Sequence, residues 1–123
     1  MSLRSTRAAW HNCIHPVFAE SFLDSLDGLP SHDALSDPTL MAEAELVVDG
    51  QSGALRGLVV RRTSGVRLFD QAVLATLRAV FPIEPVPAEI ASSDGNVYFT
   101  WEFHGNRDEA CSTYFARPSI LLL

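Results

Sequence analysis

The fold of this chain is decided by residues 59–103, which read VVRRTSGVRLFDQAVLATLRAVFPIEPVPAEIASSDGNVYFTWEF. A strand ends at Thr63-Ser64-Gly65, an amphipathic helix follows over residues 68–80, and Phe81-Pro82 ends that helix. Residues 96–104 then alternate bulky apolar side chains with polar ones, which is typical of a strand that lays one face on a core. The stretch contains no constellation of catalytic residues, so it favours a binding module over an enzyme.

Upstream of this stretch, residues 39–49 and 55–62 predict the two strands of a hairpin. The segment between them, DGQSG, carries two glycines and reads as a turn. A helix joins the strand at 55–62 to the strand at 96–104, so the simplest sheet places 39–49 between them, with a right-handed crossover. The strands at 55–62 and 96–104 are then the two edges of the sheet.

The N-terminal part predicts a helix over residues 6–26, because Trp10, Ile14 and Phe18 recur at a helical spacing. Pro16 lies inside the pattern and either begins the main helix or kinks it, with His15 extended before it. The expected fold is α+β, with a three-stranded antiparallel sheet and a packed crossover helix. We divide it into an N-terminal helical extension (1–38), the sheet domain (39–106) and a C-terminal tail (107–123) that packs on the domain.

The bulk properties restrict the partners. The chain has 123 residues, of which 47% are hydrophobic, and this is enough for one folded domain. Its net charge is −6 without a basic run, which disfavours nucleic acid and anionic membrane surfaces. No apolar run approaches the roughly 20 residues that span a bilayer. The N-terminus lacks the apolar core of a signal peptide, which leaves open an excised domain with any signal or anchor upstream.

The sharpest metal-like pattern is His11-Asn12-Cys13-Ile14-His15. Zinc sites use four Cys, His or carboxylate ligands, and residues two apart on a helix do not share a face. Completion of such a site requires a distant residue, for which Cys111, His32 and His104 are the candidates. Structural roles for these side chains are favoured, so we expect no metal and no cofactor.

The cysteines allow three interpretations. Cys13 beside two histidines resembles a nucleophilic pair, but no oxyanion motif lies within reach in the sequence, and no catalytic residues are expected. Cys13 and Cys111 lie near opposite ends of the chain, and an oxidising compartment would allow one disulfide between them. Two buried thiols are the other option, and composition leaves both open.

The strand at 96–104 offers a different kind of site. An edge strand exposes unpaired N–H and C=O groups, which can pair with an extended peptide, while Tyr98, Thr100 and Glu102 could give selectivity. The alternative is an edge covered by the C-terminal tail or by a second copy of the chain.

The ordered set Thr63-Ser64-Gly65, Phe69-Asp70-Gln71-Ala72, Leu77, Phe81-Pro82, Pro85 and an alternating strand resembles the C-terminal domain of TonB and its relatives. The resemblance covers residues 43–104, about half of the chain. It implies a helix packed on a three-stranded antiparallel sheet whose last strand pairs with a short peptide of an outer-membrane partner. Carried over to this chain, the partner-binding residues are Asn96, Val97, Tyr98, Phe99, Thr100, Trp101, Glu102 and Phe103.

The function that the resemblance implies is mechanical and not enzymatic. A periplasmic domain, anchored in the inner membrane through an upstream region, would transmit force or energy from an inner-membrane motor complex to the envelope partner. Transport, secretion and surface motility are all compatible with this role, as is a structural domain that forms a homodimer through its edge strand. A periplasmic setting also favours the Cys13–Cys111 disulfide.

Overall fold

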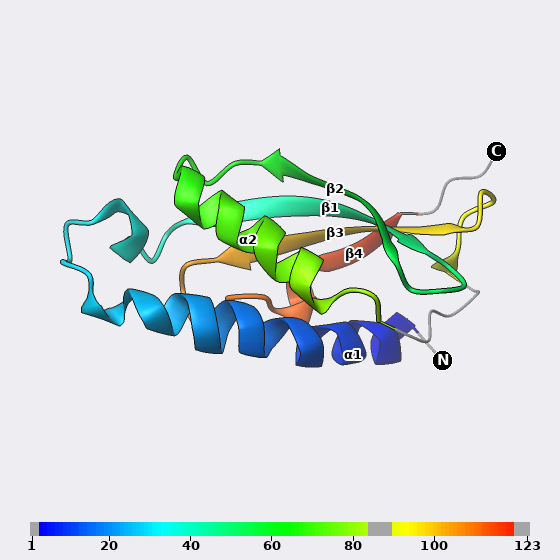
Figure 1. Ribbon diagram of the computed structural model, residues 1–123, viewed down its shortest axis with the longest axis horizontal. Helices are drawn as coiled ribbons and strands as arrows, with labels where there is room; N and C mark the ends of the chain where they lie inside the picture. The colour runs from blue at the N-terminus through cyan, green and yellow to red at the C-terminus, as the bar shows by residue number, and fades with distance from the viewer. Residues whose placement is uncertain (1–2, 84–89, 120–123) are drawn as a thin grey trace.

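The computed structural model describes residues 3–83 and 90–119 (Figure 1). Its helices are α1 (Leu3–His15), the π-helix η1 (Pro16–Leu23) that continues it, and α2 (Arg67–Val80). Its strands are β1 (Met41–Asp49), β2 (Leu55–Arg62), β3 (Asn96–His104) and β4 (Ala116–Ser119). Short 3-10 turns lie at Leu26–Gly28 (η2), Ala34–Ser36 (η3) and Thr113–Phe115 (η5). Residues 84–89, which follow Phe81-Pro82 and include Pro85 of the TonB-like pattern, lie outside the described residues.

The strands form one antiparallel sheet in the order β2-β1-β3-β4. The hairpin strand β1 is central, as expected, and pairs with β3 along its whole length, from Met41 opposite His104 to Asp49 opposite Asn96. The α+β class is confirmed. The prediction of three strands is wrong, because four residues of the C-terminal tail form a fourth.

The fourth strand changes the edges of the sheet. β4 pairs with β3 from Tyr98 opposite Ser119 to Trp101 opposite Ala116. The expectation that 96–104 is an edge strand is therefore wrong over its central residues. The physical reason is that the tail returns along the outer edge of β3, where the buried Ala116 lies opposite Trp101. β4 there pairs with backbone groups that an open edge would leave unpaired.

Both helices cover the same face of the sheet (Figure 1). This follows from the strict alternation of β1 and β3, in which every second side chain is buried. η1 and α1 pack over β3, where the Phe18 ring lies 4.9 Å from that of Phe103 and the Trp10 ring lies 5.0 Å from that of Phe99. α2 contributes Phe69, whose ring lies 5.8 Å from that of Phe18. The N-terminal helix thus shares the core of the sheet domain.

The helix passes through Pro16 without a break. His15 has φ −56° and ψ −47°, which is helical, so the expectation of an extended His15 is wrong. Proline removes one backbone donor and crowds the preceding turn, and a π-helix from Pro16 onward accommodates both because its hydrogen bonds reach one residue further. His15 therefore lies one turn beyond His11 on the same helix face.

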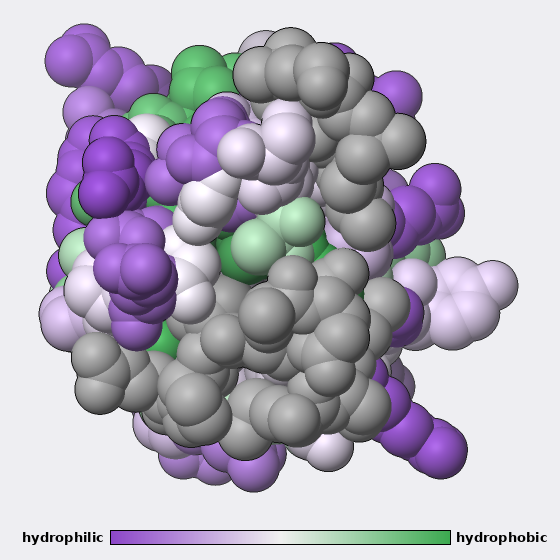
Figure 2. Space-filling model, turned by 90° about the vertical axis from the view of Figure 1, so that its right-hand side faces the viewer, coloured by the Kyte–Doolittle hydropathy of each residue, from purple (hydrophilic) through white to green (hydrophobic). Residues whose placement is uncertain are grey.

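The surface at one end of the molecule is mainly hydrophilic where residues are described. Figure 2 shows purple residues around the rim of this end and small, separate green areas between them. Within residues 3–83 and 90–119, no helix is long and apolar enough to cross a membrane.

Candidate functional site

Two places in the structure carry the residues that the sequence pattern singled out. The first is β3, whose eight predicted partner-binding residues divide by face. Tyr98, Thr100 and Glu102 lie half-buried on the sheet face opposite the helices, as does Asn96. The other four are fully buried in the core and can offer a partner only their backbone: Val97, Phe99, Trp101 and Phe103.

β4 occupies the outer side of β3 at these residues. The Thr100 hydroxyl donates to the carbonyl of Arg117 at 3.5 Å, across the β3–β4 pair. A hollow of about 270 Å³ lies on the open face beside it, lined by Glu45, Arg61, Tyr98, Phe99, Thr100 and Ser119. The outer edge of β3 therefore already pairs with an extended segment that runs antiparallel to it.

Charged and polar groups on this open face are already paired. Arg61 Nη1 lies 3.2 Å from Glu45 Oε2, and the Tyr98 hydroxyl donates to Asp94. The hydrogen bond from Tyr98 lowers the pKa of the Asp94 carboxyl and raises that of the Tyr98 hydroxyl. These contacts hold Tyr98 beside the hollow.

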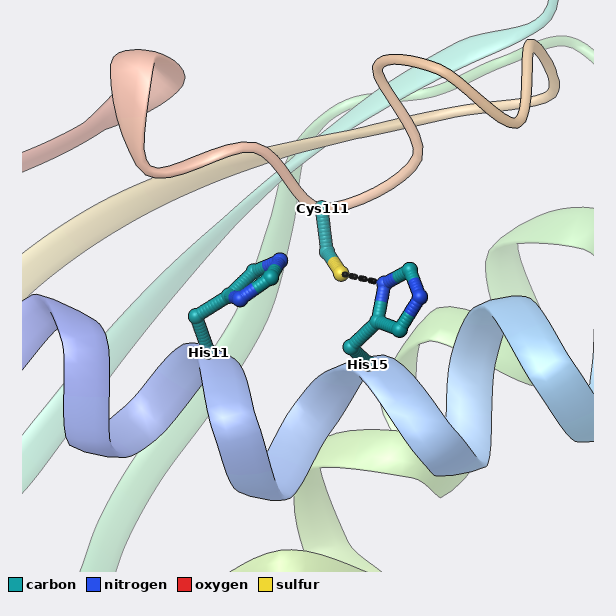
Figure 3. A group of neighbouring side chains, drawn as sticks. All are labelled: His11, His15 and Cys111. Atoms are coloured by element: carbon teal, nitrogen blue, oxygen red, sulfur yellow. Dashed lines mark hydrogen bonds between the residues drawn. The ribbon is translucent and has the colours of Figure 1, made fainter.

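The second place is a group of three side chains, the His–Cys cluster, formed by His11, His15 and Cys111. One ligand atom from each lies within 4.8 Å of the others, and this is the group of metal-ligating type found in the described residues. Figure 3 shows both imidazoles rising from α1 toward the Cys111 thiol, which descends from the segment above the helix. Cys111 Sγ lies 3.6 Å from His15 Nδ1, and the two imidazole centroids are 5.1 Å apart.

The environment of the cluster decides its chemistry. Cys111 is 1% exposed, and burial raises the pKa of its thiol to about 12. Burial, together with the charge of His15, lowers the pKa of His11, which favours the neutral imidazole. A nucleophilic cysteine needs a lowered thiol pKa and access to solvent, and Cys111 has neither. The arrangement suits a metal ligand set better than a Cys–His catalytic pair.

The predicted Cys13–Cys111 disulfide is absent, and both residues are free thiols. Cys13 is exposed, whereas Cys111 is buried against the helix face that carries His11 and His15. Residues two apart on a helix point in nearly opposite directions, so Cys13 cannot reach Cys111 without rotation of α1. The metal-like pattern considered from the sequence, His11, Cys13 and His15, is not brought together as one ligand group, for the same reason.

The segment that carries Cys111 is held at two further points. The Trp101 indole N–H donates to the Cys111 carbonyl at 3.1 Å inside the core. The Arg107 guanidinium donates to the Leu23 carbonyl at 2.7 Å and to the carboxylates of Asp24 and Asp27 at 2.9 and 2.6 Å. These bonds dock the segment along α1 and η1, and they place the thiol over the histidines.

From the sequence, Cys111 was one candidate for a further metal ligand beside the two histidines, but nothing in the sequence favoured it. His32 and His104 were equal candidates, and the structure leaves both outside the cluster. The signal that could have found the cluster is the spacing of four between His11 and His15, which puts both on one helix face once Pro16 is tolerated.

Comparisons with models of protein families, with curated proteins and with solved structures found no match to this chain.

Proposed function

We propose that this chain is a TonB-like module that binds an extended peptide of an envelope partner by strand addition on β3, in the position that β4 occupies. The observation that carries the proposal is β4 itself. The chain lays its own extended segment along Tyr98–Trp101, and this is the edge at which the TonB resemblance locates partner binding. In the free chain, β4 then occupies the position that the partner strand takes on binding.

β4 has the properties of a replaceable strand. It is four residues long, and only Ala116 is buried, whereas Arg117 and Ser119 are exposed. Pro118 lies opposite Phe99 and cannot donate to the ladder, because proline has no N–H. A partner segment with a full set of donors and a longer register would pair with more of β3, which spans nine residues.

The opposite edge of the sheet is less suited to a partner strand. β2 carries the exposed side chains of Arg56, Arg61 and Arg62, and its pairing with β1 is interrupted at two places. Charged side chains and bulges are the devices by which natural sheets protect edges from adding strands. They also disfavour self-association through β2, because two copies of this strand would bring arginines together. The second candidate, self-association through β3, is distinguished by the test below.

The cellular role that fits this module is that of a periplasmic energy transducer, anchored in the inner membrane through an upstream region. This part of the proposal rests on the resemblance alone. The binding reaction requires no catalytic group and no cofactor.

The test displaces β4 in the full chain and offers a replacement strand. Ala116→Asp puts a carboxylate at a fully buried position opposite Trp101, which costs several kcal/mol and should detach β4. The probe is a fluorescent peptide with the chain's own residues 113–123. We expect this variant to bind the probe in a titration monitored by anisotropy, and the native chain, whose β4 occupies the edge, to bind it at least tenfold more weakly.

The matched control is Arg117→Asp, the same new residue at the neighbouring exposed position, which should behave as the native chain. A probe methylated on its backbone nitrogens should lose binding, because strand addition depends on main-chain donors. A folded Ala116→Asp variant with a mobile tail that does not bind the probe would refute the proposal. If this variant dimerises instead, as light scattering would show, the self-association alternative replaces it. A chain that ends at Phe115 serves as a second variant if the substitution unfolds the domain.

A further inference from the structure

The His–Cys cluster joins two parts of the chain that are distant in sequence. His11 and His15 lie on α1, and Cys111 lies 96 residues after His15, in the segment that leads to η5 and β4. Imidazole nitrogens and a cysteine thiolate form the ligand sets that proteins use for zinc. The cluster therefore has the right donors, supplied by two separate elements.

The distances fit a tetrahedral ion. With the usual zinc bond lengths, nitrogen and sulfur ligands of one tetrahedron are about 3.6 Å apart. The Cys111 Sγ to His15 Nδ1 distance is 3.6 Å, and all three ligand atoms fall within 4.8 Å of one another. A small inward rotation of His11 is enough to complete three of the four positions. His15 has 36% of its side chain exposed, so water can reach the fourth.

The groups behind the ligands also fit. Glu20 Oε1 lies 3.9 Å from His15 Nε2, on the side of the ring away from the thiol. A carboxylate that accepts a hydrogen bond from a ligating histidine orients the ring, and the exposed Glu20 side chain needs to move closer by about 1 Å to accept one. The Cys111 backbone is held by the hydrogen bond from the Trp101 indole, so the thiol is fixed from the core side.

We propose that His15 Nδ1, a ring nitrogen of His11 and Cys111 Sγ bind one zinc ion, which fastens the Cys111 segment to α1. Zinc binds the thiolate, so binding releases the thiol proton to solvent and changes no oxidation state. Because Cys111 precedes β4 by five positions, the ion also tethers the start of the strand that covers β3. The zinc proposal does not rest on the proposed peptide capture, and either proposal can fail without the other.

The test is a titration of the full, reduced, metal-free chain with Co²⁺ and then Zn²⁺. Co²⁺ should give a thiolate-to-metal charge-transfer band and tetrahedral visible bands with a stoichiometry of one, and Zn²⁺ should displace it. Free zinc at about 100 times its dissociation constant should raise the midpoint of thermal unfolding by about 10 °C. Zinc should also slow amide exchange in residues 107–116 more than in β2.

The variants separate this site from adventitious binding to thiols or histidines. Cys111→Ser and His15→Gln should each abolish the charge-transfer band or weaken cobalt binding at least 100-fold. His11→Gln, at a half-buried position that leaves the buried thiol in place, is the second variant if Cys111→Ser unfolds. The matched control is Cys13→Ser, which changes the exposed thiol on the other side of α1 and should bind as the native chain does.

Three results would overturn the proposal. The first is a native chain without the charge-transfer band, and the second is a band that Cys13→Ser abolishes while Cys111→Ser retains it. The third is stoichiometric binding without slower exchange in residues 107–116, which would refute the fastening of the segment to α1.

Discussion

The two edges of the sheet are protected from strand addition in different ways. On one side, β2 has no neighbouring strand among the described residues and carries arginines and irregular pairing instead. On the other, β3 lies over the aromatic core and is covered by four residues of the chain's own tail. Charged side chains and bulges make an edge a poor template for a further strand, whereas β3 already pairs with a short segment. The β3 edge is therefore the one at which we propose strand addition.

The largest expected effect is on the β3 side. Trp101 is fully buried, and its indole donates to the Cys111 carbonyl. The centroid of its ring lies 6.5 Å from that of Trp10 and 5.9 Å from that of Phe99. Trp101→Ala should lower the free energy of unfolding by about 3–5 kcal/mol. Urea denaturation of the purified chain measures this value.

The matched change on the other side is Val59→Ala. Val59 is 53% exposed on β2, so this truncation should cost less than about 0.5 kcal/mol. If Trp101→Ala and Val59→Ala lowered the free energy of unfolding by similar amounts, the expected difference between the β3 and β2 edges would be contradicted.

The second effect concerns the turn that holds the β2 side in place. Gly53 has φ +73°, and a Cβ there would lie 2.2 Å from the Ile83 carbonyl oxygen. Gly53→Ala should therefore cost about 2–4 kcal/mol, from backbone strain and from displacement of the chain after α2. Gly65→Ala is the control, because φ is +84° but nothing lies within 4 Å. It should cost about 1 kcal/mol, and thermal unfolding of both variants compares them.

The smallest effect is a pH dependence of the same turn. Asp49 accepts hydrogen bonds from the Gln51 amide, the Arg56 guanidinium and the Ser52 hydroxyl, and these lower its pKa from 3.8 to about 2. Because the folded pKa is lowered, the stabilisation is present above pH 4 and is lost as the pH falls through 2. Asp49→Asn should be less stable than the native chain at pH 6, and the difference should shrink between pH 4 and pH 2. A difference that stays constant over this range, measured by urea denaturation, would contradict the assignment.

Periodicity was enough to predict the regular elements. Residues 96–104 alternate so strictly that both the bounds of β3 and its buried face are confirmed. β2 is confirmed at its predicted bounds of 55–62, and α2 differs from the predicted helix by one residue at its start. These elements depend on local patterns that few other structures satisfy.

Neither β4 nor the His–Cys cluster could be predicted in the same way. Ala116–Ser119 reads ARPS, which is too short for its alternation to stand out and includes a proline, so its strand conformation comes from pairing with β3. The cluster depends on a helix that continues through Pro16, against the usual effect of proline, because packing of Trp10 and Phe18 on the sheet outweighs the lost hydrogen bond.

The sequence by itself determined the α+β class, the hairpin, the crossover helix and the buried face of the strand at 96–104, because these follow from the spacing of apolar residues along short segments. Only the tertiary structure decided which edge of the sheet is covered and which cysteine meets the histidines. Both depend on the return of residues 105–119 over α1 and β3, which is fixed by contacts between residues about 80–100 positions apart, such as Arg107 with Leu23 and Cys111 with His15. Local pattern carries no information on such contacts, since their geometry exists only once the core has formed.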